Sequence, residues 1–256
     1  MQTAIYTILG KDEIGEDISN VFKAEGVGEK YVIWDDVHGS NVSVVLNYQG
    51  ERTILVYHQP RIYSWPADFG PTNWIYYTSI GKEHASIHEP LKNYLVSNQV
   101  NLAFNPGTWQ LKEGLEVLKP FIQASKVFAV NKDEAQKLVG EASDIKELLK
   151  AVKNHCAGIV LITDGDKGSF AYDGQKFYQC GLFPAKVLEK TGAGDSYTTA
   201  FVAALFYGKN IPEAMAWGAV NSASVIEQIG PQAGLLRKEQ ILAKIEENPD
   251  FRGKEF

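Results

Sequence analysis

Two different spacings of apolar residues divide the first part of the chain. An apolar run at 6–9 predicts a short strand, and apolar residues recurring every three or four positions over 14–22 predict a helix that Gly26 ends. Over 42–58 apolar and polar residues alternate around Gln49-Gly50, which predicts a β-hairpin with one apolar face. Because an isolated hairpin is only marginally stable, we expect another sheet, a ligand or a second subunit to cover that face.

From residue 74 onward the pattern is strand, helix, strand. Apolar runs predict strands at 75–79, 101–104, 126–130, 157–163 and, shorter, near 185–188. Helical spacing predicts helices at 83–98, 109–118, 131–139, 143–155, 194–207, 212–227 and 237–246. Asp173-Gly174, flanked by aromatic residues, predicts a second hairpin. The alternation indicates a parallel sheet with helices on its faces, in one α/β domain over 1–256 with a small β-lid near residues 30–60.

Composition excludes several classes of protein. The 256 residues carry 25 basic and 31 acidic side chains, a formal charge of −6, and no cluster of Lys and Arg, so neither a nucleic-acid binder nor a membrane-surface helix is indicated. Two cysteines cannot form a disulfide framework for a chain of this size. No apolar stretch approaches the roughly 20 residues that span a bilayer. We expect a soluble, cytoplasmic protein that binds neither nucleic acid nor membrane.

The segment 191–194, Thr-Gly-Ala-Gly, stands between the short strand and a long apolar helix. Glycines permit a tight turn, and the N–H groups at a helix start favour an anion such as phosphate. Asp195 in the first helical turn has two interpretations that local physics leaves open: a helix cap, or a carboxylate that acts beside a bound anion. The spacing does not fit a P-loop, and Tyr197 stands where a dinucleotide-binding motif has its third glycine, which disfavours an NAD-dependent enzyme.

Residues 191–196, Thr-Gly-Ala-Gly-Asp-Ser, resemble the C-terminal signature of the ribokinase-like, PfkB-type carbohydrate kinases. Further motifs of that family are matched in the same order: the G-x-D-x-x-G segment by 8–15, the lid hairpin by 50–53, the Asn-x-x-Glu motif by 131–134, the nucleotide loop Thr-x-Gly-x-x-Gly by 163–168, and the helix beside the adenine by 219–226. The resemblance implies a three-layer α/β/α ribokinase-like domain with a mostly parallel central sheet and a small β-lid.

The resemblance also implies a reaction: transfer of the γ-phosphoryl group of ATP to a hydroxyl of a sugar, nucleoside or related small alcohol. Asp195 is implied to be the base, and the amides of Gly192, Ala193 and Gly194 an anion hole. Glu134 is implied to hold Mg²⁺ through water, although Asn131 and Glu134 also fit a helix capping box. The implied nucleotide contacts are Asn131, Thr163, Gly165, Gly168, Thr191 and Asn221.

The sequence departs from the family pattern at two places. The N-terminal strand and the Gly-Gly substrate segment of the family are not found before Ile5, so we expect an exposed sheet edge and a homodimer formed through that edge or through the lid. Glu189 and Lys190 stand where the family has Asp and usually Thr. Either Glu189 helps to bind a monovalent cation such as K⁺, or the Lys190 ammonium replaces that cation.

Two alternative functions remain open at this point. One is a non-catalytic nucleotide-binding protein, because the N-terminal substrate residues are missing, and the other is a vitamin or pyrimidine kinase of the same fold. The sequence does not identify the sugar or nucleoside.

Overall fold

The computed structural model describes residues 1–48 and 51–256, with side chains described outside 47–52. The expected turn at Gln49-Gly50, and with it Gly50 of the lid motif, lies outside the described residues. The described residues form two compact units: the first is Met1–Thr72 with Ile80–Asn98, and the second is Asn73–Ser79 with Gln99–Phe256. No helix in the described part of the chain is both long enough and apolar enough to cross a membrane.

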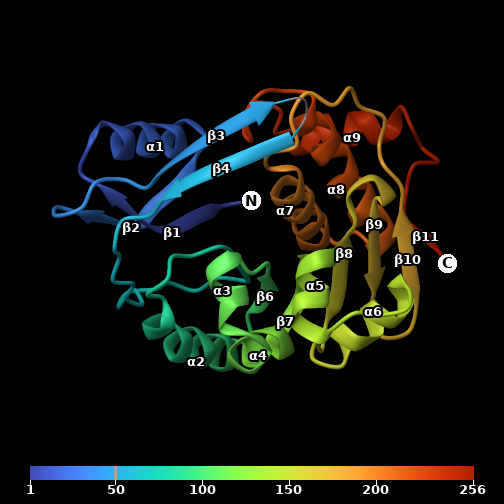
Figure 1. Ribbon diagram of the computed structural model, residues 1–256, viewed down its shortest axis with the longest axis horizontal. Coiled ribbons are helices and arrows are strands. Elements are labelled where there is room, and N and C mark those ends of the chain that lie inside the picture. The colour runs from blue at the N-terminus through green and yellow to red at the C-terminus, as the bar shows by residue number, and fades with distance from the viewer. Residues whose placement is uncertain (49–50) are drawn as a thin grey trace. The chain divides into compact units, whose positions relative to one another are not determined.

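The second unit is built on a sheet whose seven described strands lie in the order β11-β10-β9-β8-β7-β6-β5 (Figure 1). Its strands are β5 (Trp74–Tyr77), β6 (Asn101–Phe104), β7 (Ser125–Asn131), β8 (Ile159–Thr163), β9 (Ser169–Tyr172), β10 (Phe177–Cys180) and β11 (Lys254–Glu255). Strands β5 to β8 are mutually parallel, and β9, β10 and β11 continue the sheet in antiparallel pairs. The mostly parallel central sheet predicted from the sequence is therefore confirmed.

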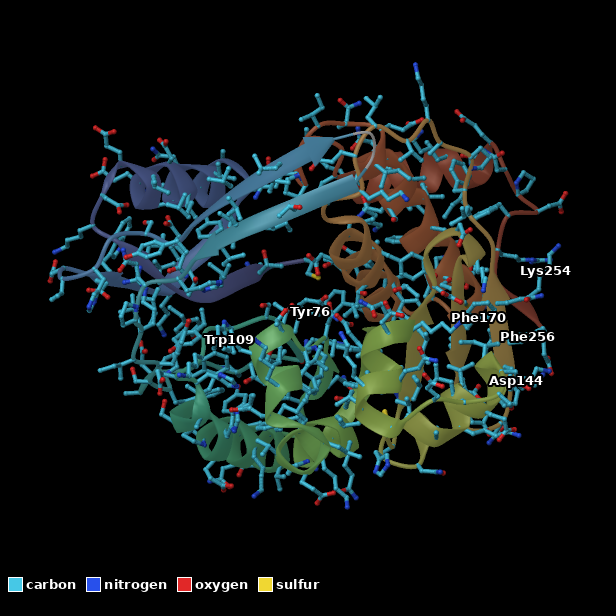
Figure 2. The ribbon with its side chains drawn as sticks, in the orientation of Figure 1. Tyr76, Trp109, Asp144, Phe170, Lys254 and Phe256 are labelled. Carbon is cyan, nitrogen blue, oxygen red and sulfur yellow. The ribbon has the colours of Figure 1, made fainter. Side chains whose placement is uncertain are left out.

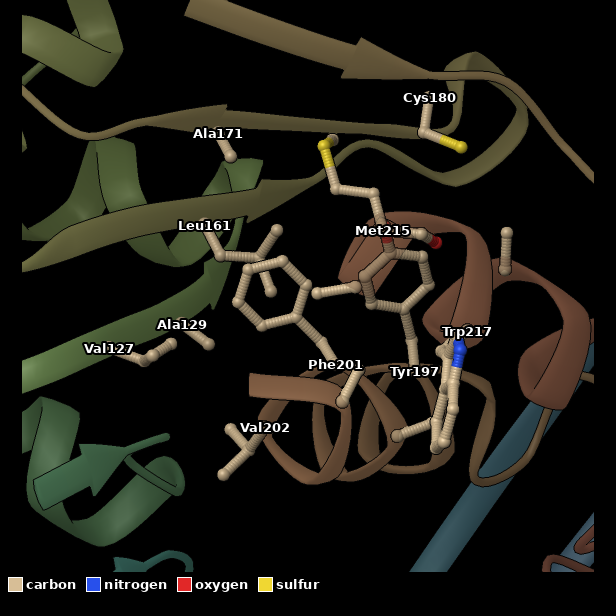
Figure 3. Packing of buried hydrophobic residues seen from close by; sticks show 14 of the residues in the cluster. Val127, Ala129, Leu161, Ala171, Cys180, Tyr197, Phe201, Val202, Met215 and Trp217 are labelled. Carbon is tan, nitrogen blue, oxygen red and sulfur yellow. The ribbon is translucent and has the colours of Figure 1, made fainter. Parts of the chain in front are cut away.

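Helices cover both faces of this sheet. They are α3 (Thr108–Glu113), α4 (Leu115–Ala124), α5 (Lys132–Val139), α6 (Ile145–Lys153), α7 (Ala193–Phe206), α8 (Ile211–Ile226) and α9 (Lys238–Glu246), with the short 3-10 turn η2 (Gly165–Lys167). On one face, Phe201 of α7 and Met215 of α8 pack against buried Ala129 and Leu161 of the strands (Figure 3). On the other face, Phe104 of β6 packs edge-on against Phe121 of α4. Burial of alternate strand residues on opposite faces produces the three-layer architecture.

Two local predictions in this unit were wrong. The helix expected over 109–118 is broken at Gly114, whose φ of 81° no continuing helix accepts, so α3 and α4 are separate. The strand expected near 185–188 does not form. Instead the Leu188 N–H donates to the Ile226 carbonyl at the end of α8, at 2.8 Å, and the sheet edge beside β10 is taken by β11. The hairpin at Asp173-Gly174 is confirmed, with two turn amides donating to the Asp173 carboxylate.

The first unit is smaller and its strands form two separate pairs. Its elements are β1 (Thr3–Gly10), α1 (Glu13–Ala24), β2 (Val27–Asp35), β3 (Val42–Tyr48), β4 (Glu51–Tyr57), the 3-10 turn η1 (Ala85–Ile87) and α2 (His88–Asn98). Strands β1 and β2 are parallel, while β3 and β4 form the predicted antiparallel hairpin. The sequence pattern did not predict β2.

Polar contacts organise the first unit around the G-x-D-x-x-G segment. Asp12 accepts hydrogen bonds from the Gly15 amide at the start of α1 and from the amide and hydroxyl of Ser40, at 2.6–2.8 Å. A Cβ on Gly10 would lie 2.3 Å from the Ser40 nitrogen, and one on Gly15 would lie 2.1 Å from the Gly10 carbonyl oxygen. The motif is therefore explained here by close packing: its glycines let a helix and a loop approach one strand end.

The β3–β4 hairpin carries apolar side chains on both faces, contrary to the single apolar face expected from its alternation. The pairing register puts Val44 beside Leu55 on one face and Val45 beside Ile54 on the other. All four side chains are exposed, with Leu55 at 56%. The prediction failed because it followed only the residues that alternate. Val45 and Leu55 are apolar as well, and neighbouring residues of a strand point to opposite faces.

Candidate active site

The predicted catalytic turn lies at the start of α7, in the second unit. Gly192 has a left-handed backbone with φ of 80°, and a Cβ there would lie 2.7 Å from Pro231, so this position requires glycine. A Cβ on Gly194 would meet no heavy atom within 4 Å, so nothing in the described chain crowds the first turn of α7 at this position. The N–H groups of a first helical turn have no partner within their own helix, so this end of α7 favours an anion.

Glu189 holds the glycine turn through hydrogen bonds. Glu189 is 9% exposed, and its carboxylate accepts hydrogen bonds from the Thr191 hydroxyl at 2.5 Å and from the Gly230 amide at 2.8 Å. Lys190 is exposed, and its carbonyl accepts a long 3.3 Å bond from the Ala193 amide. The two residues that depart from the family signature thus differ in role: Glu189 shapes the turn, and the Lys190 side chain lies on the surface.

Asp195 lies in the first turn of α7 and is exposed. Burial raises the pKa of the Glu134 carboxyl above its ordinary value, and the negative charge of Asp195 raises that pKa further. The structure therefore brings Asp195 and Glu134 within electrostatic range of each other, although they come from α7 and α5. Two carboxylates beside each other are a donor set that suits a divalent cation.

Asn131 and Glu134 form the predicted capping box at the start of α5. The Asn131 side-chain oxygen accepts from the Glu134 amide, and the Glu134 carboxylate accepts from the Asn131 amide, both at 2.9 Å. One Glu134 oxygen, Oε2, makes this bond, so the carboxylate retains acceptor capacity for another ligand. The structural interpretation is therefore confirmed, and it leaves the functional one open.

The nucleotide-loop residues lie at the carboxyl edge of the parallel strands. Thr163 at the end of β8 is in register with Asn131 at the end of β7. Gly165 and Gly168 have positive φ of 51° and 82°, and a Cβ on Gly168 would lie 2.2 Å from the Cys180 carbonyl oxygen. This edge is where open α/β sheets bind ligands.

Asn221 is placed differently from the other predicted contacts. It is 4% exposed on α8, its amide nitrogen donates to the Ser196 carbonyl on α7, and its oxygen accepts from the Leu236 amide, both at 2.9 Å. Asn221 therefore joins α7, α8 and the segment that follows α8. Its contact with a nucleotide stays a prediction.

Three residues near this edge were missed by the sequence reasoning: Tyr76, Asn105 and Thr199. Tyr76 on β5, labelled in Figure 2, donates from its hydroxyl to the Asn105 side-chain oxygen at 3.2 Å. Asn105 directly follows β6. Burial raises the pKa of the Tyr76 hydroxyl, and a side-chain hydrogen bond with Thr199, one turn after Asp195 on α7, opposes that rise in pKa. A signal for Asn105 was available, because a polar residue directly after a buried parallel strand has the same placement as Asn131 after β7.

Comparison with known proteins gives a consistent result. Residues 1–238 match the model of the pfkB family carbohydrate kinases. An uncharacterized sugar kinase of Archaeoglobus fulgidus is 24% identical over 253 residues, which are 93% of this chain and 96% of that protein. A 5-dehydro-2-deoxygluconokinase of Listeria monocytogenes is 32% identical over 156 residues, and this match spans 58% of the chain and about half, 48%, of that kinase.

Solved structures with a similar fold are known. The structure of Arabidopsis thaliana ribokinase complexed with ribose and ATP superposes with a TM-score of 0.79 at 21% identity, covering 94% of this chain and 81% of the ribokinase. At that identity the likeness shows the fold, which is ribokinase-like.

Proposed function

The chain belongs to the pfkB family of carbohydrate kinases, and on that premise we propose that it transfers the γ-phosphoryl group of ATP to a hydroxyl of a sugar, nucleoside or related small alcohol. The observation that carries the proposal is the position of Asp195. It follows a turn that requires glycine, in the first turn of a helix whose N–H end favours phosphate.

In the proposed reaction, Asp195 accepts the proton of the attacking hydroxyl. The hydroxyl oxygen then forms a bond to the γ-phosphorus, the bond from that phosphorus to the bridging oxygen breaks, and ADP leaves. The amides of Gly192, Ala193 and Gly194 stabilise the charge on the transferred group, as donors fixed before the reaction do. A positioned base contributes about 10²–10⁴-fold to such a rate.

ATP and Mg²⁺ are assigned to the carboxyl edge of the sheet. We assign the nucleotide contacts to the residues predicted from the sequence: Asn131, Thr163, Gly165, Gly168, Thr191 and Asn221. Supporting this, Asn131 and Thr163 are in register, and a Cβ on Gly165 would meet nothing within 4 Å. Glu134 fits a Mg²⁺ site through water, because it lies in electrostatic range of a second carboxylate and Mg²⁺ prefers oxygen ligands while keeping several waters. When bound, Mg²⁺ neutralises charge on the phosphates.

The test is ADP release with Mg-ATP over a panel of sugars and nucleosides that includes ribose and 5-dehydro-2-deoxygluconate. We expect turnover of at least one sugar, and a loss of about 10²–10⁴-fold in kcat for Asp195→Asn. Asp17→Asn, which alters an exposed aspartate on α1, is the matched control and should retain wild-type turnover. If Asp195→Asn matches the wild type, the assignment of the base is wrong. ATP binding with no turnover of any substrate would instead support the non-catalytic nucleotide-binding alternative.

Glu189 could take one of two roles, binding a monovalent cation or holding the glycine turn. Both of its oxygens already accept hydrogen bonds from Thr191 and Gly230, which favours a role in holding the turn. We therefore expect activity to change less than twofold when K⁺ is replaced by tetramethylammonium at constant ionic strength. A loss of tenfold or more would assign a K⁺ site to this turn.

We also propose that a second copy of the chain covers the β3–β4 hairpin. Exposed apolar side chains stand on both of its faces, and a substrate or a neighbouring segment can cover one face of a hairpin more readily than two. Light scattering after size-exclusion chromatography should give a homodimer that Val45→Lys converts to a monomer. A wild-type monomer at all concentrations contradicts the proposal.

A further inference from the structure

A pair of buried hydroxyl groups joins the predicted nucleotide loop to the helix that carries Asp195. Ser169 is the first residue of β9 and directly follows Gly168, the last glycine of the loop. Tyr197 lies two residues after Asp195 on α7 and belongs to the buried cluster (Figure 3). The two hydroxyl oxygens are 2.5 Å apart. Ser169 and Tyr197 are 1% and 6% exposed, so this hydrogen bond is shielded from solvent.

The direction of the hydrogen bond follows from a third group, the Met215 carbonyl of α8. The Tyr197 hydroxyl donates to that carbonyl at 3.2 Å, and a phenol has only one proton. The Ser169 hydroxyl is therefore the donor to the Tyr197 oxygen. Burial raises the pKa of the Tyr197 phenol well above its ordinary value, so the phenol keeps its proton at neutral pH. One side chain of α7 thus connects β9 and α8 through two hydrogen bonds.

Ser169 is the residue at which the nucleotide loop rejoins the sheet. It pairs with Thr163 of β8 on one side and with Cys180 of β10 on the other. The loop between β8 and β9 folds back on itself, and the Asp164 amide donates to the Gly168 carbonyl at 2.9 Å. A displacement of Ser169 would therefore displace Thr163 and Gly168, to which we assign the nucleotide.

The start of α7 is held against α8 directly after Asp195. The Asn221 amide nitrogen donates to the Ser196 carbonyl at 2.9 Å. The ring of Tyr197 lies where Gly218 of α8 has no side chain, because a Cβ on Gly218 would be 2.7 Å from that ring. These contacts fix the two residues that follow Asp195, and with them the backbone from which its carboxylate projects.

On the basis of the proposed phosphoryl transfer, we infer that Ser169 and Tyr197 are positioning residues, which hold the nucleotide loop in place relative to Asp195. Phosphoryl transfer depends on the alignment of the attacking oxygen with the γ-phosphorus, and a misplacement of about 1 Å can lower such a rate about 10²-fold. The groups to be aligned are assigned to different segments, ATP to the loop after β8 and the base to α7. The hydroxyl pair links those two segments directly.

The first test compares two buried serines of the same unit. Ser169→Ala removes the hydroxyl that joins the loop to Tyr197, so the loop is held less firmly around ATP. The KM for ATP should rise by about 3–10-fold and kcat should fall by a similar factor, while the KM for the acceptor should not change. A loss of folded protein would lower kcat alone.

Ser125→Ala is the matched control. Ser125 is 2% exposed at the start of β7, the end of that strand away from Asn131, and its hydroxyl donates to the Phe121 carbonyl at 2.7 Å. The control therefore loses a buried hydroxyl of the same kind and should keep the wild-type KM for ATP. An unchanged KM for ATP in Ser169→Ala, or an equal rise in the control, overturns the inference.

Tyr197→Phe tests the other member of the pair. It keeps the ring and removes the oxygen, so the KM for ATP should rise at least as much as in Ser169→Ala. Adding Ser169→Ala to Tyr197→Phe should have no further effect on that KM, because both substitutions remove the same hydrogen bond. If the two effects multiply instead, the residues act separately and do not form a positioning pair.

Hydrogen exchange followed by mass spectrometry gives a readout that needs no turnover. In Tyr197→Phe the amides of residues 164–168 should exchange about 3–10-fold faster than in the wild type, and those of β7 should not change. If the wild type is active but neither this exchange nor the KM for ATP responds, the inference fails and the kinase activity stands. If the wild type turns over no substrate, the kinase proposal fails, and the exchange alone decides whether the pair holds the loop.

Discussion

The two units of this chain stabilise themselves in different ways. In the second unit, side chains such as Leu102, Phe104 and Phe128 are at most 1% exposed between sheet and helices. In the first unit, Ile14 and Val21 of α1 and much of the β3–β4 hairpin leave apolar surface exposed, while Asp12 and Asp35 join its segments through hydrogen bonds. The comparison indicates that hydrophobic burial holds the second unit, whereas ionised carboxylates make a larger contribution in the first.

The largest expected effect comes from the same substitution made in each unit. Leu102→Ala removes a fully buried side chain and should lower the free energy of unfolding by about 2–5 kcal/mol, because a cavity remains. Leu55→Ala in the hairpin, where the side chain is 56% exposed, should change it by less than about 0.5 kcal/mol. Urea denaturation at low protein concentration measures both. If both substitutions lower the free energy of unfolding equally, the two units do not differ in hydrophobic burial. If the effect of Leu55→Ala grows with protein concentration, a second copy of the chain covers the hairpin.

A smaller, local effect is expected from Arg61→Met. The Arg61 side chain is 2% exposed and donates to the Asp35 carboxylate and to the Gly39 carbonyl, both at 2.5 Å, so its loss leaves a carboxylate and a carbonyl without these donors. Losing these charge-assisted bonds should raise the rate of chymotrypsin cleavage within residues 1–72 by about tenfold. Cleavage within 99–256 should be unchanged. Cleavage that rises equally in both ranges would show that the units do not open separately.

The smallest expected effect is a difference in acid sensitivity. The Ser40 and Gly15 hydrogen bonds lower the pKa of Asp12, and those of His38 and Val37, with Arg61, lower the pKa of Asp35. A folded pKa below the unfolded value of about 3.9 gives stability that is complete above that value and is lost as the pH falls through the folded pKa. Glu134 in the second unit has a raised pKa, so its protonation over the same range favours the folded state.

Pepsin at about pH 3, with fragments identified by mass spectrometry, should therefore cut within residues 1–72 before it cuts within 99–256. Asp12→Asn provides the control: chymotrypsin at neutral pH should already cut within residues 1–72 of this variant faster than in the wild type, and acidification should change its susceptibility less. If pepsin cuts within residues 99–256 first, ionised carboxylates do not make the larger contribution to the stability of the first unit.

The sequence predicted the second unit better than the first because the second unit buries more of its apolar side chains. Strands buried on both faces give continuous apolar runs, so the parallel strands β6, β7 and β8 were found within about two residues of their ends. The first unit buries less, so β2 gave no clear pattern, and the apolar spacing of α1 marks exposed Ile14 and Val21 while the helix buries Gly15 and Ser19. The two-residue strand β11 depends on tertiary pairing with β10, which no local pattern contains.

The candidate site divides in a similar way. The glycine turn, Asp195 and the capping box at Asn131 were identifiable because they are contiguous in sequence. Tyr76 and Thr199 were not, because β5 and α7 are more than a hundred residues apart and the contact arises from the order of strands in the sheet. The resemblance implied that Asn221 contacts a nucleotide, which stays a prediction, and its two hydrogen bonds to Ser196 and Leu236 could be seen only in the structure.

The segment after α8 is fastened at both of its ends, with the Gly230 amide bonded to Glu189 and the Leu236 amide bonded to Asn221. The Gly230 N–H therefore reports on the glycine turn, and the Leu236 N–H reports on the place where Asn221 joins α7 to α8. In an ¹⁵N-labelled sample they serve as a built-in pair of spectroscopic reporters. A ligand that distorts the turn shifts the Gly230 resonance, one that moves α7 against α8 shifts that of Leu236, and comparing the two separates these motions without any attached label.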